Sequence, residues 1–363
     1  MSKTKVAVLG TGFIAHIHLE SYHRFVHDAE VVAVYGRNAG NAEAFARQYG
    51  IPAWYDDLDK LLEETDAEVV DICVPNYLHH EACMKSAARG KHIIIEKPLA
   101  MTLDEADEMI AVCKEKNLKL MYAEELCFAP KYERVRALVN AGALGDVYMM
   151  KQMEKHSGPH SAWFYKKETA GGGVMMDMGC HALEWFRWMT GNAKVKTVFA
   201  DMKTVLHKDI TDCDDNSIVI VEFENGVVGM AEDSWARHGG MDDRIEVYGT
   251  KGVSFADLFR GNAALTYSLS GYDYASEKAG DTRGWTFTVF EEAFNQGYPQ
   301  ELAHFIKCVR EDLTPLVTGE DGRVVLEMIY AAYESARTGA KVALPFYKKV
   351  KYPIELLLSM SEP

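Results

Sequence analysis

The sequence predicts an α/β protein, with a doubly wound parallel sheet followed by an α+β domain that has a large, mostly antiparallel, open sheet. In the first third of the chain, short β-branched runs alternate with helical segments, which is typical of parallel sheets covered by helices. After residue 126, several strand-like runs follow one another with short turns between them. The 363 residues suffice for two domains, which we expect to span residues 1–125 and 126–363.

Each element of the first domain follows from a local pattern. Strands are predicted where apolar, β-branched residues run together, over residues 5–10, 29–36, 67–75, 91–98 and 118–125. Helices are predicted between them, over residues 16–25, 42–50, 56–64, 79–90 and 102–117. Thr102 and Glu105 have the spacing of a capping box, which fixes the start of the last of these helices.

The second domain is predicted in the same way. Helices are expected over residues 130–145, 171–191, 300–312 and 322–339. Strands are expected over residues 146–156, 194–206, 244–259 and 263–271, with a hairpin over 215–236 that turns at Asn225-Gly226. Near the end of the chain, Ile354 and Leu356–Leu358 are apolar enough that we expect them to dock, with a neighbouring subunit as one candidate surface.

The composition excludes several classes of function. A net charge of −15 argues against a nucleic-acid surface, because phosphate binding needs clustered lysine and arginine. The seven scattered cysteines contain no CxxC pair, so neither a disulfide framework nor a cysteine zinc site is indicated. No apolar run approaches the roughly 20 residues that span a bilayer, and we find no secretory signal, so we expect a cytoplasmic protein without membrane contact.

The first strand leads into a glycine-rich turn with the pattern G-x-G-x-x-A, formed by Gly10, Gly12 and Ala15 around Phe13 and Ile14. Gly10 permits the tight turn, Gly12 allows a pyrophosphate to approach the backbone, and Ala15 permits close packing of helix on strand. The following helix N-terminus offers free N–H groups to phosphates. This pattern, placed between a strand and a helix, predicts a dinucleotide site.

The end of the second strand bears on the choice of cofactor. An acidic residue there would bond the ribose hydroxyls of NAD, but this sequence has Gly36-Arg37-Asn38. Arg37 could lie against a 2′-phosphate, which favours NADP mildly, or could be an exposed loop residue. The cofactor is therefore expected to be NAD(P), with a slight preference for NADP.

The run GGGVMMDMGCHALEWFRWMTG, residues 171–191, carries one carboxylate, Asp177, and one imidazole, His181, in an otherwise apolar segment. On a continuous helix the two side chains lie one turn apart, within about 40° of each other. An acid and a base at the edge of a core need a partner, which could be each other, a metal or a substrate.

The run KHIIIEKPLA contains Glu96-Lys97-Pro98 at the end of the fourth strand. Together with the glycine turn, the GGG…D-x-x-x-H segment and DRIEVYGTKG (243–252), it resembles the glucose–fructose oxidoreductase/inositol dehydrogenase (Gfo/Idh/MocA) family. The resemblance runs in order over nearly the whole chain. It implies a Rossmann domain and an α/β sheet domain that often forms an oligomer interface. It also implies NAD(P)-dependent oxidation of sugars, sugar derivatives, glycosides or cyclitols.

The same resemblance implies roles for individual residues. Lys97 matches the family's lysine beside the cofactor, and Asp177 and His181 match its second signature. Pro75, Asn76 and His79 match the loop that lies along the cofactor, and Glu96 also lies there. The family often has an Arg-Phe pair after the fifth strand, whereas this chain has ELCFAP, with Cys127 in place of the arginine.

Oxidation of a secondary alcohol needs a group that accepts the hydroxyl proton, because the cofactor takes only the hydride. Histidine titrates near neutrality, so His181 is the candidate base, and Asp177 could orient it or bind an adjacent hydroxyl. Lys97, at the carboxyl end of a strand, would donate a hydrogen bond to the reacting oxygen. Lys97, Asp177 and His181 are thus both catalytic and substrate-binding candidates.

The loop KHSGPHSAWF offers further substrate contacts. His156, His160 and Trp163 could bond or stack on a sugar, or could form an ordinary surface loop. Glu154 with the two histidines could conceivably bind zinc, but no fourth ligand is evident, so we expect no metal.

Two other functions stay open. One is a redox-assisted glycosidase or a sugar reductase of the same family, and the other is a cofactor-binding regulator without catalysis.

Overall fold

The computed structural model describes residues 2–260, 263–270, 283–289 and 291–359. The chain forms two compact units, one of residues 1–125 with 297–326 and the other of residues 126–296 with 327–363. The N-terminal stretch of the first unit ends at residue 125. Residues 297–326, which the sequence assigns to the second domain, instead belong to the first unit because α11 (Tyr298–Arg310) packs against α1 (Phe13–Arg24).

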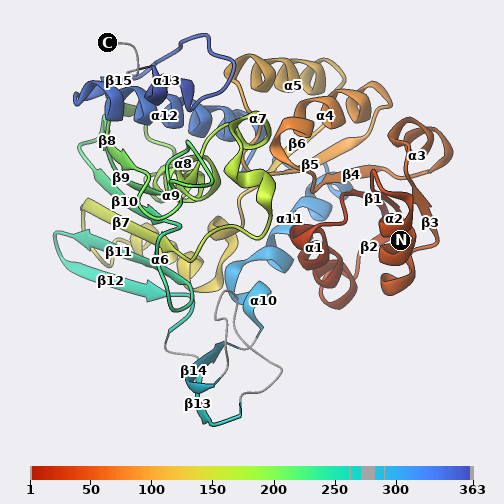
Figure 1. The fold of residues 1–363 in the computed structure, drawn as a ribbon, viewed down its shortest axis with the longest axis horizontal. Coiled ribbons are helices and arrows are strands. Elements are labelled where there is room, and N and C mark those ends of the chain that lie inside the picture. The colour runs from red at the N-terminus through yellow and green to blue at the C-terminus, as the bar shows by residue number, and fades with distance from the viewer. Residues whose placement is uncertain (1, 261–262, 271–282, 290, 360–363) are drawn as a thin grey trace. The chain divides into compact units, whose positions relative to one another are not determined.

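The first unit is built on a six-stranded parallel sheet in the order β3-β2-β1-β4-β5-β6 (Figure 1). Its strands are β1 Thr4–Leu9, β2 Ala29–Tyr35, β3 Ala53–Tyr55, β4 Val69–Ile72, β5 His92–Glu96 and β6 Leu120–Ala123. Strand order reverses between β1 and β4, which is the doubly wound arrangement that the sequence predicts. The short strand β3 was not among the predicted strands. Three of its residues pair with β2.

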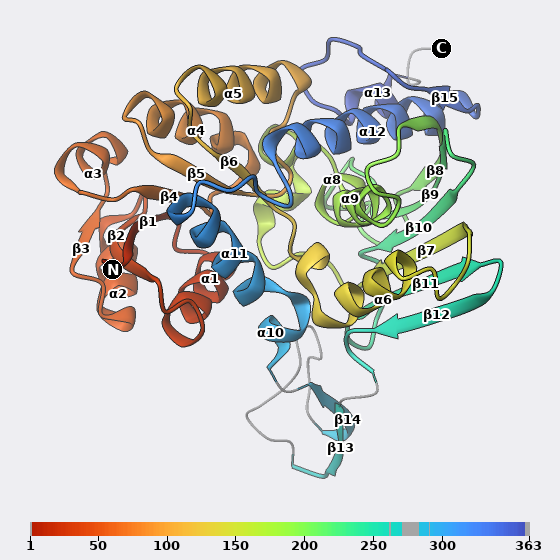
Figure 2. The same ribbon diagram turned by 180° about the vertical axis from the view of Figure 1, so that it is seen from behind.

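The helices of the first unit lie on both faces of this sheet. Figures 1 and 2 show α4 and α5 on one face and α1 and α11 on the other. Besides α1 and α11, they are α2 Ala39–Tyr49, α3 Leu58–Glu64, η1 Asn76–Leu78, α4 His79–Ala88, α5 Leu103–Glu115 and η2 Glu125–Phe128, the last crossing into the second unit. Thr102 and Glu105 form the predicted capping box, and Gly50 ends α2 in the left-handed conformation.

The second unit contains a seven-stranded sheet in the order β12-β11-β7-β10-β9-β8-β15. Its strands are β7 Val147–Lys155, β8 Val195–Lys203, β9 Asn216–Phe223, β10 Val228–Ser234, β11 Asp242–Gly249, β12 Gly252–Asp257 and β15 Val342–Ala343. Only β7 and β10 pair in parallel, so the sheet is mostly antiparallel, as predicted. The predicted segment 244–259 forms two strands, β11 and β12, joined by a tight turn.

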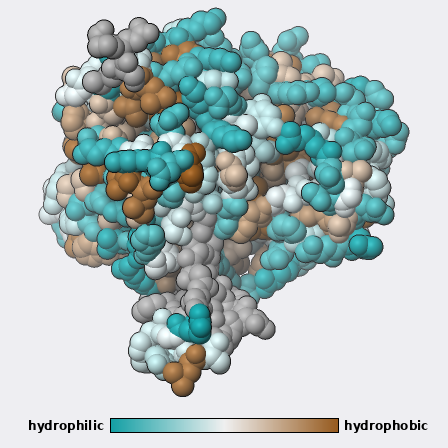
Figure 3. Space-filling view, in the orientation of Figure 1, coloured by the Kyte–Doolittle hydropathy of each residue, from teal (hydrophilic) through white to brown (hydrophobic). Residues whose placement is uncertain are grey.

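A separate two-stranded ribbon, β13 Ala263–Ser268 with β14 Gly284–Val289, follows β12. Gly271, the last residue of the strand predicted there, lies outside the described residues. Tyr267, Leu269 and Trp285 are exposed, and an apolar patch is visible at the end of the ribbon in Figure 3.

Helices cover one face of the seven-stranded sheet. The helices of this unit are α6 Pro130–Asn140, η3 Ala162–Tyr165, α7 Lys167–Ala170, α8 Val174–Asp177, α9 Gly179–Met189, α10 Glu292–Gln296 and α13 Glu355–Leu358, together with α12 Gly319–Thr338, which begins in the first unit. Of these, α8 and α9 pack directly on β7, β9 and β10. The tail docks within its own unit: Ile354 and Leu356 are buried, and the Ile354 N–H donates to the Gly171 carbonyl. None of the helices among the described residues combines the length and apolarity that a membrane crossing needs.

Candidate active site and cofactor site

The glycine-rich turn between β1 and α1 has the geometry of a phosphate cradle. Gly10 has φ +124°, and a Cβ added there would lie 2.3 Å from the Cys73 carbonyl oxygen, so only glycine fits. Gly12 is the N-cap of α1, and a Cβ there would meet nothing within 4 Å. Ala15 is fully buried against the sheet. The open space at Gly12, directly before the free N–H groups of a helix N-terminus, suits a pyrophosphate.

The other residues of the turn face outward to different degrees. Phe13 is 43% exposed, and Ile14 is half-buried. Arg37 follows β2 and is exposed, and its Nη1 donates a hydrogen bond of 2.6 Å to the Tyr77 hydroxyl of η1. The structure thus brings Arg37 and the 75–79 loop together within the first unit.

His79 has a structural role that the sequence does not reveal. It is fully buried, with Nδ1 2.9 Å from the Pro98 carbonyl and Nε2 2.9 Å from the Val74 carbonyl. Burial lowers the pKa of His79, and the Val74 and Pro98 carbonyls oppose that shift. Its imidazole ties the 74–79 loop to the segment after Lys97. Pro75 and Asn76 begin the same loop, with Asn76 buried.

Lys97 stands at the carboxyl end of β5, where parallel strands open onto a ligand crevice. It is half-buried, and its backbone N–H donates to Glu96 Oε2 at 3.1 Å. Glu96 is buried, and its Oε1 lies 3.0 Å from His18 Nε2. Both carboxylate oxygens of Glu96 therefore have contacts within the first unit, and Glu96 directly precedes Lys97.

The segment with Asp177 and His181 does not form the single helix that the sequence predicts. The helix breaks at Met178, so Asp177 ends α8 and His181 lies in the first turn of α9. The backbone N–H of His181 bonds the Met178 carbonyl, which replaces the expected bond to the carbonyl of residue 177. Both side chains are nevertheless buried, at 8% and 3% exposure. The predicted continuous helix is therefore replaced by two helices, although the acid and the base share one buried segment.

Trp235 holds Asp177 in place. Its Nε1–H donates to Asp177 Oδ2 at 3.0 Å, and the indole is fully buried directly after β10. Phe164 and Tyr165 pack against the cluster that Trp235 forms with Val174 and Met178. Sequence analysis missed Trp235, because nothing local to its position signals a contact with a residue 58 positions earlier.

Asp214 and its partner Tyr333 explain two of the three glycines that open this segment, Gly172 and Gly173. Asp214 Oδ1 accepts from the Gly173 N–H at 3.1 Å and the Tyr333 hydroxyl at 2.9 Å, and Asp214 Oδ2 accepts from the Met175 N–H at 2.8 Å. A Cβ at Gly173 would lie 1.9 Å from the Asp214 carbonyl oxygen, and one at Gly172 would lie 2.2 Å from the Tyr333 hydroxyl. Asp214 thus acts as the cap of α8, supplied from a distant loop.

Replacing Asp214 by alanine should lower the free energy of unfolding by about 2–4 kcal/mol, since three buried donors lose their acceptor. Denaturant unfolding of the second unit measures the change. The matched control is Asp212→Ala, an exposed residue of the same loop, which should leave stability within about 0.5 kcal/mol. Equal effects of the two substitutions would contradict the capping role.

The expected substrate loop is only partly accessible. His156 is buried, and its Nδ1 accepts from the Gly158 N–H at 3.1 Å. His160 is exposed, and Trp163 is half-buried and stacked on Phe164 with ring centroids 3.7 Å apart. Of the three predicted contacts, His160 and Trp163 reach the surface of the second unit, whereas His156 supports the loop.

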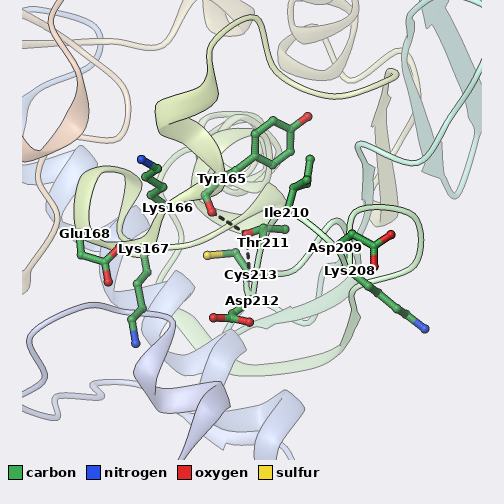
Figure 4. A pocket seen from close by; sticks show the side chains of 10 residues that line it. All are labelled: Tyr165, Lys166, Lys167, Glu168, Lys208, Asp209, Ile210, Thr211, Asp212 and Cys213. Atoms are coloured by element: carbon green, nitrogen blue, oxygen red, sulfur yellow. Dashed lines mark hydrogen bonds between the residues drawn. The ribbon is translucent and has the colours of Figure 1, made fainter.

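Close to this loop, a cavity of ≈ 270 Å³ opens between the 165–168 and 208–213 segments. Figure 4 shows that the Thr211 hydroxyl, which donates to the Tyr165 carbonyl at 2.8 Å, joins the two walls. Its lining mixes three lysines with three acids: Lys166, Lys167, Lys208, Glu168, Asp209 and Asp212. None of the predicted site residues lines this cavity.

Two family models match most of the chain. Residues 4–124 match the model of an oxidoreductase family with an NAD-binding Rossmann fold, and residues 132–254 match the GFO/IDH/MocA C-terminal domain. The chain is 27% identical to myo-inositol 2-dehydrogenase of Thermotoga maritima, covering 94% of this chain and 98% of the relative. It is 28% identical to D-glucoside 3-dehydrogenase of Escherichia coli, covering 94% and 98%.

Among solved structures, GenD2 from gentamicin A biosynthesis, in complex with NAD, superposes with a TM-score of 0.90 at 29% identity, covering 95% of this chain and 97% of that one. Both halves of the chain, including the glycine turn and the Asp177–His181 segment, lie within the matched family regions. The chain therefore belongs to the Gfo/Idh/MocA family of oxidoreductases with an NAD-binding Rossmann fold.

Proposed function

We propose that this protein is an NAD(P)-dependent dehydrogenase that oxidises a secondary hydroxyl group of a sugar, glycoside or cyclitol. The observation that carries the proposal is the buried Asp177–His181 segment, which Trp235 and Asp214 hold from outside. A buried acid and base held by dedicated contacts are typical of a reacting site. The names of the relatives, an inositol 2-dehydrogenase and a glucoside 3-dehydrogenase, support the class of substrate.

In the proposed reaction, His181, Asp177 and Lys97 each have a separate role. His181 accepts the proton of the reacting hydroxyl, and the nicotinamide supplies the hydride acceptor when it is bound. Asp177, fixed by the Trp235 indole, bonds a substrate hydroxyl or the imidazole. Lys97 donates a hydrogen bond to the reacting oxygen and favours its alkoxide character. His160 and Trp163 contact the rest of the sugar.

The glycine-rich turn between β1 and α1 binds the phosphates of the cofactor. Gly10 and Gly12 keep the backbone clear of side chains, and the N-terminus of α1 faces the space at Gly12. Phe13 and Ile14 continue this surface. Pro75 and Asn76 border it, and His79 fixes their loop.

Replacing Arg37 by alanine should weaken NADP binding at least about tenfold and NAD binding less than about threefold, because only NADP carries a 2′-phosphate that a guanidinium can bond. The dissociation constants of both cofactors, measured by fluorescence titration, test this. The control is Arg47→Ala, an exposed arginine in the last turn of α2. Equal losses for the two cofactors would show that Arg37 does not read the phosphate.

We also infer a homo-oligomer that forms through the uncovered face of the seven-stranded sheet. In the register of the sheet, Phe199, Ile220 and Met230 lie side by side on that face, as do Tyr248 and Val253. Ile218, Val253 and Phe255 on it are 42%, 47% and 64% exposed, an apolar surface that association would bury. The cytoplasmic location also stays a prediction.

A screen of sugars, glycosides and inositols with NAD and NADP tests the proposal, followed through the absorbance of the reduced cofactor. We expect stoichiometric formation of reduced cofactor and oxidised sugar with at least one of them. Turnover without net cofactor reduction would instead indicate a redox-assisted glycosidase. Tight cofactor binding without any turnover would indicate a regulator.

A further inference from the structure

The first unit contains a buried histidine that the proposed chemistry does not use. His18 lies on α1 and is fully buried between the strands β4 and β5 and the helix α11. Its Nδ1 lies 2.9 Å from Asp71 Oδ2, and its Nε2 lies 3.0 Å from Glu96 Oε1. One imidazole therefore faces carboxylates from two neighbouring strands.

The two contacts of the His18 ring bear on whether the ring is neutral or protonated. A neutral imidazole carries one N–H, so its other nitrogen would point a lone pair at a carboxylate oxygen about 3 Å away. The Tyr22 hydroxyl donates to Asp71 at 3.1 Å and the Cys73 thiol donates at 3.5 Å, so donors surround the Asp71 carboxylate. An imidazolium carries an N–H at both positions, so it bonds Asp71 through Nδ1 and forms an ion pair with Glu96 at Nε2, where the contact is close but not aligned as a hydrogen bond.

The groups around the ring agree with this state. Burial opposes a charge on His18, but the attraction of Asp71 outweighs it and raises the pKa of the imidazole well above its usual range. Burial raises the pKa of Cys73, so it stays a neutral thiol.

On α11, Glu301 is fully buried, and burial, with Glu125 and Glu96 nearby, raises the pKa of its carboxyl well above the ordinary value. Glu301 is therefore a neutral acid, and Tyr298 adds an aromatic ring 6.0 Å away.

Glu96 connects the buried His18 to Lys97. Glu96 is the last residue of β5, with Oε1 at His18 and Oε2 accepting the backbone N–H of Lys97. The same carboxylate thus joins the buried imidazole to the peptide group that begins Lys97. We propose that His18 is a positioning residue whose buried imidazolium fixes Glu96 and, through it, the peptide group of Lys97. Its link to catalysis rests on the proposed function.

A metal ion is the competing explanation. The ligand atoms of His18, Asp71 and Cys73 all lie within 4.8 Å of one another. Two ligands of a tetrahedral zinc ion, each about 2.0–2.1 Å from the metal, lie about 3.3 Å apart. The separation of 2.9 Å between His18 Nδ1 and Asp71 Oδ2 is instead a normal hydrogen-bond length. The observed spacing therefore favours a shared proton over a shared metal.

The first test needs no substrate. The protein is labelled with ¹⁵N at its 13 histidines, and the His18 ring signals are assigned by their loss in His18→Gln. We expect both ring nitrogens to stay protonated from about pH 6 to about pH 8, the range in which an ordinary exposed histidine loses its proton. A neutral His18 ring at pH 7, or one equivalent of tightly bound metal in elemental analysis, would overturn the proposal.

The second test follows the peptide group of Lys97. In His18→Gln, its amide hydrogen should exchange at least about tenfold faster than in the wild type, because Glu96 loses its fixed partner. The control, His23→Gln on the same helix, should leave the rate unchanged. An unchanged Lys97 exchange rate in His18→Gln refutes the coupling, and because this readout uses no substrate it stands apart from the proposed function.

The third test connects the positioning to turnover. His18→Gln should lower kcat about ten- to a hundredfold with little change in the KM for cofactor, as expected when a reacting group is displaced by up to about 1 Å. Wild-type kcat in His18→Gln would overturn the positioning role. A wild-type enzyme inactive toward every polyol would overturn the proposed function and leave the first two results intact.

Discussion

Replacing His181 by asparagine should lower kcat by about 10²–10⁴-fold, which is the usual contribution of a general base. Asparagine keeps a polar side chain in the buried first turn of α9 but cannot accept the hydroxyl proton. The dissociation constant of the cofactor should stay unchanged, because the glycine turn lies in the other unit. Steady-state kinetics and a cofactor titration on the same sample measure the two effects separately.

The control for this substitution is His238→Asn, an exposed histidine of the second unit. It should retain full activity. If His181→Asn turns over as fast as His238→Asn, His181 is not the base. If both kcat and cofactor affinity collapse together with the folded structure, the milder His181→Gln gives the same comparison.

Replacing Lys97 by methionine should lower kcat by about 100–1,000-fold, the typical cost of removing one charged or hydrogen-bonding group that stabilises a developing oxyanion. Methionine keeps the length and the apolar stem of the side chain, so packing at the end of β5 should change little. The KM for substrate should rise less than kcat falls, because the ammonium bonds the alkoxide more strongly than the alcohol. Initial rates over a range of substrate concentrations measure both quantities.

Lys116→Met serves as the control, since Lys116 is exposed at the end of α5 in the same unit. We expect wild-type kinetics from it. A Lys97→Met enzyme with unchanged kcat would remove Lys97 from the reaction and would leave it, at most, a residue of the cofactor surface.

The fold could be predicted largely because its patterns are local. Alternating β-branched runs and helices mark β1 to β6, and the capping box at Thr102 sets the start of α5. The return of residues 297–326 to the first unit could not be predicted, because a helix shows which face is apolar but not which partner covers it. The strand β3 was missed because three residues are too short for a periodic signal.

Part of the candidate site could also be predicted from the sequence, and part could not. Glycines at 10 and 12, and the acid and base at 177 and 181, are visible as motifs. Their supports are not visible: Asp214 and Trp235 reach the Asp177 segment from residues far along the chain. The break at Met178 also escapes prediction, since the apolar pattern runs on through it. A sequence pattern therefore finds candidate site residues more readily than the residues that hold them.

The pH dependence of hydride transfer in single turnovers tests most directly whether His181 removes the substrate proton. With a substrate from the screen, and with a deuterium isotope effect to show that the chemical step is observed, the wild-type rate should rise between about pH 6 and pH 8 and then level off. The rate in His181→Asn should be far lower and should lack that rise. A His181→Asn enzyme that keeps the wild-type rate and the same rise would contradict the account.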